Sequence, residues 1–109
     1  MIEVPANDSV TSPLTVRDVL VKARELVAHR WLQHVYEQNL PDGVAYCSVG
    51  AVNAAAGVPH NQMTALTSAC RDALRKVINH WSVPLWNDHK GRTQTEVVEM
   101  FDRAISGLP

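Results

Sequence analysis

Residues 63–78, MTALTSACRDALRKVI, carry the clearest helical pattern in the chain and decide the fold that we expect. Apolar side chains recur at the spacing of one helix face, and charged side chains fill the opposite face. The apolar set is Met63, Leu66, Cys70, Ala73, Leu74, Val77 and Ile78, and the charged set is Arg71, Asp72, Arg75 and Lys76. The pattern predicts an amphipathic helix with Cys70 in the core.

Two segments follow this helix toward the C-terminus. Residues 80–92 contain two tryptophans, a proline and a glycine, and this irregular composition predicts a structured loop. Thr93 and Glu96 then have the spacing of a capping box, and an apolar stripe runs from there to Gly107. A last helix is therefore predicted between Thr93 and Gly107.

Two more helices are predicted on the N-terminal side. A short helix of small residues, capped by Ser48 and stopped by Gly57, is expected to be buried. The first helix begins at Thr15, where Asp18 completes a weaker capping box, and its apolar stripe extends to Trp31. Its end stays open, since the apolar residues 32, 35 and 36 could prolong the helix until the chain reaches Pro41.

The four helices and their short connections predict an all-α fold, a compact single-domain bundle with a tryptophan-containing loop before the last helix. Residues 1–13 are expected to form a flexible arm, and residues 14–109 the helical domain. The turn sequence Asp42-Gly43, followed by residues 44–46, leaves a small hairpin possible near Val44.

Composition restricts the classes of function. The 109 residues have a net charge of −1 and no basic stripe, which disfavours nucleic acid as a partner. No apolar run approaches the length of about 20 residues that spans a bilayer, and MIEVPANDSV lacks the features of a signal peptide. We therefore expect a cytoplasmic protein without membrane contact, with Cys47 and Cys70 as free thiols.

Several short motifs recur in a known order: Trp31-Leu32-Gln33, then Cys47-Ser48-Val49-Gly50-Ala51, then the string WND..GRT..EV from Trp86 to Val97. Their order resembles an uncharacterised family of short proteins of actinobacteria and their bacteriophages, a domain of unknown function, over roughly residues 16–104. The resemblance implies an actinobacterial or phage source and assigns no catalytic residue to this chain.

Cys47 is the strongest single candidate for chemistry. It precedes a predicted helix N-terminus, where a thiolate is favoured. His89 or His80 could serve as base and Asp88 as orienting carboxylate, which predicts, as one alternative, a small cysteine-dependent hydrolase or transferase. The competing interpretation, which we favour, is that Cys47 is a small buried residue.

The five histidines do not form a metal motif. His29, His34, His60, His80 and His89 include no pair at i, i+4, and no CxxC accompanies them. No metal site and no cofactor are expected. Nucleotide and common hydrolase motifs are also missing from the sequence, and a helix-turn-helix across residues 51–79, as in a DNA-binding regulator, has little support from the charge balance.

The loop WSVPLWNDHKGRT is the best candidate for recognition, because tryptophans beside polar groups are typical of binding surfaces. The opposing interpretation is that the tryptophans close the end of the bundle while Asp88 pairs with Arg92. We expect a non-catalytic accessory protein that binds another protein, such as a host factor, or associates with itself. The expected partner-binding residues are Trp86, Asn87, Asp88 and Arg92.

Overall fold

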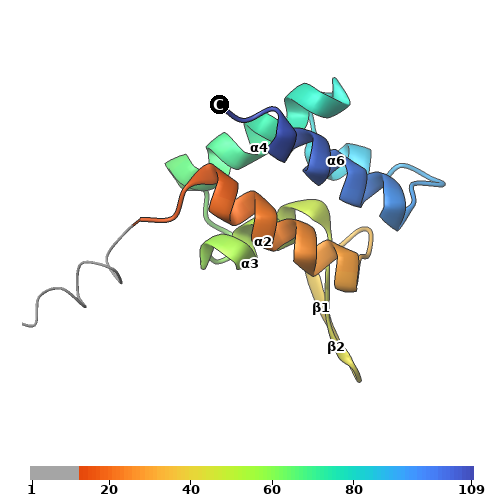
Figure 1. Ribbon diagram of the computed structural model, residues 1–109. Helices are drawn as coiled ribbons and strands as arrows, with labels where there is room; N and C mark the ends of the chain where they lie inside the picture. The colour runs from red at the N-terminus through yellow and green to blue at the C-terminus, as the bar shows by residue number, and fades with distance from the viewer. Residues whose placement is uncertain (1–12) are drawn as a thin grey trace, which may run out of the picture.

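The computed structural model describes residues 13–109, which form five helices and one two-stranded antiparallel sheet. In Figure 1, helix α2 lies between α3 and α6, and the hairpin extends away from the helices. The predicted arm, apart from Pro13, lies outside the described residues. The elements are α2 (Val16–His29), β1 (Glu37–Leu40), β2 (Gly43–Tyr46), α3 (Ser48–Ala56), α4 (Ala65–Ile78), α5 (Val83–Asn87) and α6 (Gln94–Ser106).

Helix α2 lies at the centre of the hydrophobic core. Its buried side chains are spaced three or four residues apart, so that they form one stripe, and this stripe packs against α3 and α6. Phe101 of α6 and Leu74 of α4 are among the largest fully buried side chains. Cys70 is fully buried, as predicted. The buried residues of α2 are Val19, Leu20, Ala23 and Val27.

Three predicted signals at helix ends, at Thr15, Gly57 and Thr93, are confirmed. Thr15 and Thr93 each form a reciprocal capping box, with Asp18 and with Glu96 respectively. Gly57 ends α3 with a φ of 73°, a left-handed conformation that glycine adopts without strain. Helix α4, predicted over residues 63–78, begins at Ala65, behind its cap Thr64.

The prediction of an all-α fold is wrong, because residues 37–46 form the hairpin of β1 and β2. Helix α2 ends at His29 instead of continuing through Tyr36, since Arg30 is extended and His34 has a φ of +78°. Pairing of Glu37 with Tyr46 then sets the register. The small α/β domain therefore keeps its core between helices and adds a hairpin at one side.

The predicted loop 80–92 also contains a helix. Ser82 caps helix α5 by accepting a hydrogen bond from the Leu85 N–H, and Pro84 occupies an early helical position where proline is tolerated. Five residues are too few to show a helical period, which is why the sequence pattern favoured a loop.

Candidate functional site

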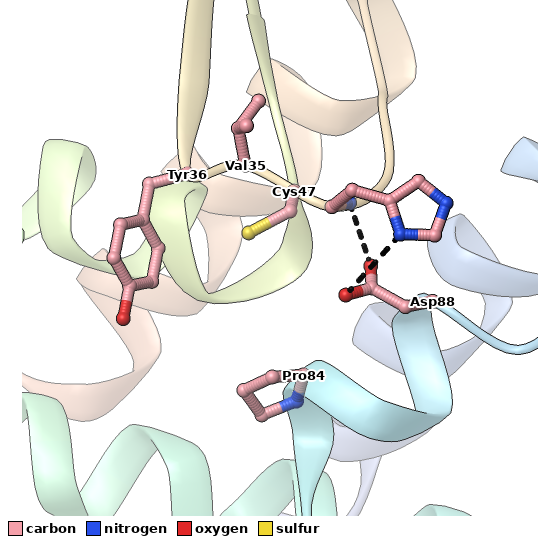
Figure 2. Close-up of a pocket in the computed structure, with 6 residues that line it drawn as sticks. Val35, Tyr36, Cys47, Pro84 and Asp88 are labelled. Atoms are coloured by element: carbon pink, nitrogen blue, oxygen red, sulfur yellow. Dashed lines mark hydrogen bonds and ion pairs between the residues drawn. The ribbon is translucent and has the colours of Figure 1, made fainter.

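A pocket of about 410 Å³ opens between the entrance of the hairpin and helix α5 (Figure 2). Figure 2 shows Tyr36 and Asp88 on opposite sides of the pocket, with Cys47 and Pro84 between them. Val35 and Tyr36 are 51% and 46% exposed, so the hairpin side of the pocket presents apolar surface to solvent. The lining residues are His34, Val35, Tyr36, Cys47, Pro84 and Asp88.

The wall that contains Tyr36 is fixed against the start of helix α3. The Cys47 N–H donates to the Tyr36 carbonyl at 3.1 Å. A Cβ added to Gly50 would overlap the same carbonyl, so the close approach of helix and hairpin requires glycine at this position. The spacing Cys-x-x-Gly thus has a packing role.

Cys47 is the N-cap of α3, in place of the Ser48 cap that we predicted. Its sulfur accepts a hydrogen bond from the Gly50 N–H at 3.3 Å, and the residue is 6% exposed. Burial raises the pKa of the Cys47 thiol, and the backbone N–H groups of Gly50 and Val49 lower it by a smaller amount. The neutral thiol is therefore the favoured form, whereas a nucleophile requires the thiolate.

Asn87 joins three segments of the chain beneath the pocket. Its Oδ1 accepts from the Trp31 indole N–H at 2.8 Å, and from the Ser48 N–H and hydroxyl at 3.0 and 2.6 Å. Its Nδ2 donates to the Leu32 carbonyl at 3.2 Å and to Asp88 Oδ1 at 2.9 Å. Because the side chain is fully buried, its contacts are internal and it presents no atom to a partner.

Asp88 lies at the rim of the pocket and fixes the turn at His34. Its Oδ1 accepts from the His34 N–H at 2.9 Å, and its Oδ2 lies 4.0 Å from His34 Nδ1. This contact stabilises the positive φ of His34, a conformation that is unfavourable for residues other than glycine. Asp88 therefore shapes the pocket and also exposes a carboxylate oxygen beside it.

Trp86 and Arg92 form a contact with each other at the C-terminal side of α5. The Arg92 guanidinium lies 3.8 Å from the centre of the Trp86 ring, and its Nε donates to the Trp86 carbonyl at 2.8 Å. Arg92 also approaches Glu96 at 3.5 Å, and not Asp88 as one interpretation of the sequence had it. Both side chains are partly buried.

The structure brings Cys47 and Asp88 to one pocket, but the proposed bases lie elsewhere. His89 Nδ1 is 2.8 Å from the Lys90 carbonyl, and His80 Nδ1 accepts from the Ser82 N–H. The histidine that lines the pocket is His34. Figure 2 shows the Cys47 sulfur turned toward Tyr36 and away from Asp88, so these two side chains do not face each other.

Within residues 13–109, no three or more His, Cys, Asp or Glu side chains form a group that could hold a metal ion. No helix among them is long and apolar enough to cross a membrane.

Several pocket residues were missed by the sequence analysis. The sequence left open whether Val35 and Tyr36 prolong the first helix, and it placed Pro84 in a loop. The position of Tyr36 depends on contacts with Cys47 and His60, which local periodicity does not report. The turn Asp42-Gly43 was the one signal that could have placed Val35 and Tyr36 at the base of a hairpin.

Comparison with known proteins gives one match. The model of a family described as "Family of unknown function (DUF6197)" matches residues 11–107. No curated protein and no solved structure matches the chain.

Proposed function

The chain belongs to the DUF6197 family, which has no assigned function, and we propose that it is a non-catalytic accessory protein that binds another protein or a second copy of itself. The binding surface surrounds the pocket between the hairpin entrance and α5. The proposal includes a cytoplasmic location in an actinobacterium or one of its phages. The two free, buried cysteines support a reducing compartment. The order of the sequence motifs in residues 31–97 supports an actinobacterial or phage source.

One observation carries the proposal: two exposed apolar side chains, Val35 and Tyr36, line a mainly apolar pocket. Val35, Tyr36 and Leu85, which follows the lining residue Pro84, are each about half exposed. Apolar surface that stays in water is unfavourable, and its concentration beside a concave site is typical of protein interfaces. A partner side chain inserted into the pocket would bury this surface.

The structure changes which residues we assign to the contact. Asp88 stays in the proposed surface, because it lines the pocket. Trp86 and Arg92 lie on the adjoining side of α5 and stay at its margin, where their stacked side chains can form part of the rim. Asn87 is left out, since a buried residue that makes five internal hydrogen bonds supports the pocket from beneath.

Catalysis by Cys47 receives no support from the geometry. A neutral thiol, turned away from Asp88 and capping a helix, lacks the base that would activate it. Labelling with iodoacetamide tests this alternative. We expect slow reaction at neutral pH that accelerates above about pH 9, whereas rapid labelling at pH 7 would favour the enzyme.

The binding proposal is tested with a charged double variant, Val35→Lys with Leu85→Lys. Tagged protein is used to capture partners from an actinobacterial lysate, and light scattering measures self-association. The control is Leu14→Lys with Val21→Lys, because these residues are similarly exposed and do not line the pocket. We expect the pocket variant to lose a partner, or to become monomeric, while the control behaves as the wild type. Equal loss by both variants, or no loss by either, contradicts the proposed surface.

A further inference from the structure

Strand β1 has an unpaired outer edge in the part of the chain that the structure describes. Strand β2 pairs with β1 on one side and contacts residues 30–32 on the other, whereas β1 pairs with β2 alone. The hairpin extends away from the helices (Figure 1), and Glu37, Gln38 and Asn39 are exposed. An exposed edge of this kind presents N–H and C=O groups with which another strand can pair.

The backbone groups at this edge belong to Glu37 and Asn39. Tyr46 donates its N–H to the Arg30 carbonyl and accepts from the Leu32 N–H, both at 3.1 Å, so its backbone groups point away from β1. In an antiparallel ladder the cross-strand partner of such a residue also points its groups outward, and the pattern repeats every second residue. Glu37, the partner of Tyr46, and then Asn39 therefore turn their N–H and C=O groups to the edge. None of these four groups has a backbone partner among residues 13–109.

The sequence of β1 restricts how two such edges can pair around a twofold axis. With Glu37 opposite Asn39 of the second copy, four hydrogen bonds form and Gln38 lies opposite its own counterpart. A shift by two residues in one direction places Glu37 opposite Glu37 of the second copy, so that like charges meet. A shift by two in the other direction places Glu37 opposite Pro41, which has no N–H to donate.

The side chains are complementary in the same register. Tyr36, which is half exposed, lies opposite Leu40 of the second copy, so that two apolar side chains meet on one face. On the other face the carboxylate of Glu37 lies opposite the neutral amide of Asn39. The net charge of −1 also gives two copies little electrostatic repulsion. The strand is therefore complementary to itself, which favours a second copy as its partner.

We propose that two copies of this chain associate through the edges of β1 and form a four-stranded antiparallel sheet with Gln38 at the twofold axis. This inference rests on the proposed function in its alternative of a second copy. It uses the strand edge in place of the pocket, and Tyr36 is the pocket residue that both surfaces share.

Substitutions at position 39 test the pairing, because the Asn39 N–H points away from β2. Asn39→Pro removes this donor and leaves the hydrogen bonds between β1 and β2 in place, whereas the matched control Asn39→Ala keeps the donor. Sedimentation over a concentration series measures the dimer, and circular dichroism checks that both variants fold. We expect Asn39→Pro to raise the dissociation constant by about 30-fold, because the dimer loses two hydrogen bonds. Asn39→Ala should stay within about threefold of the wild type.

The proposal is overturned if the wild type is monomeric at millimolar concentration. It is also overturned if Asn39→Pro folds and dimerises as well as Asn39→Ala.

A second experiment tests the register and does not depend on proline. In the proposed dimer the two Gln38 Cα atoms are about 4.5 Å apart, which is within reach of a disulfide. Oxidised glutathione should therefore link two copies of Gln38→Cys, as seen on a non-reducing gel. The control Asn39→Cys should stay unlinked, because its counterpart lies diagonally at about 7–8 Å. Cys47 and Cys70 are buried in both variants. Linking of the control alone, or of neither variant, contradicts the register.

The two proposals fail separately. If the wild type is monomeric but the Val35→Lys, Leu85→Lys variant loses a lysate partner, the pocket surface stands and the strand pairing is wrong. If Asn39→Pro dissociates a dimer that the pocket variant keeps, and that variant loses no lysate partner, the pocket is wrong and the strand edge stands. A lysate protein that binds a monomeric wild type and is lost only in Asn39→Pro assigns the edge to a foreign strand and overturns the pairing of two copies.

Discussion

Replacing Asn87 with alanine should destabilise the whole domain, because one buried amide holds three segments together. The substitution removes the acceptor of the Trp31 indole N–H and of the Ser48 N–H and hydroxyl. It also removes the donor to the Leu32 carbonyl. Ser48 is fully buried, whereas Trp31 and Leu32 are partly exposed and can be hydrated in the variant.

The magnitude follows from these burials. A buried polar group left without a partner costs about 1–3 kcal/mol, and a hydrogen bond lost at a hydrated group costs about 0.5–1.5 kcal/mol. Ser48 is the main contributor, and we expect Asn87→Ala to lower the free energy of unfolding by about 3–5 kcal/mol. That is a large part of the roughly 5–15 kcal/mol typical of a small domain, and corresponds to a Tm lower by more than about 12 °C.

Urea denaturation followed by circular dichroism and tryptophan fluorescence measures this loss. Asn39→Ala is the matched control, since Asn39 is exposed on β1 and its replacement should change stability by less than about 0.5 kcal/mol. If the free energies of unfolding of Asn87→Ala and Asn39→Ala differ by less than about 1 kcal/mol, the role assigned to the amide is refuted.

Three further predictions concern single positions. Gly50→Ala should lower the free energy of unfolding by about 1–3 kcal/mol in urea, through overlap with the Tyr36 carbonyl, and unchanged stability would contradict that contact. Thr93→Ala should cost about 1 kcal/mol in the same assay by removing the cap of α6, whereas no loss would make the capping box irrelevant. Burial raises the pKa of Cys70 to about 11, so stability should be complete below about pH 8.5 and fall by up to about 1.4 kcal/mol per pH unit as the pH rises toward that value. Cys70→Ala should reduce the slope, and an identical slope in the variant would show that other groups cause it.

The starts of α2 and α6 and the core stripe of α4 were predictable from sequence because their signals are local. Thr15 with Asp18 and Thr93 with Glu96 are capping boxes within three residues, and Cys70 sits in a regular apolar stripe. Strand β1 could not be predicted in the same way. Its sequence EQNL places three exposed polar residues before Leu40, so no alternation of polar and apolar residues marks it.

The candidate site was predictable only in part. Cys47 and Asp88 were singled out for their residue types, and both line the pocket. The burial of Asn87 depends on partners at positions 31, 32 and 48, so no local pattern could reveal it. Arg71 was assigned to the charged face of its helix, yet its Nε is buried.

The composition of the pocket has a consequence for how the family can diverge. Of the six lining residues, only Cys47 also belongs to the buried hydrophobic core. The others come from the hairpin entrance and from α5, where most side chains remain partly in solvent. Substitutions there can change which molecule is recognised while lowering the free energy of unfolding only slightly. Related chains should therefore share the glycine at position 50 and the amide at position 87. Positions 34–36 and 84–85 should vary, so that one fold can present different binding surfaces.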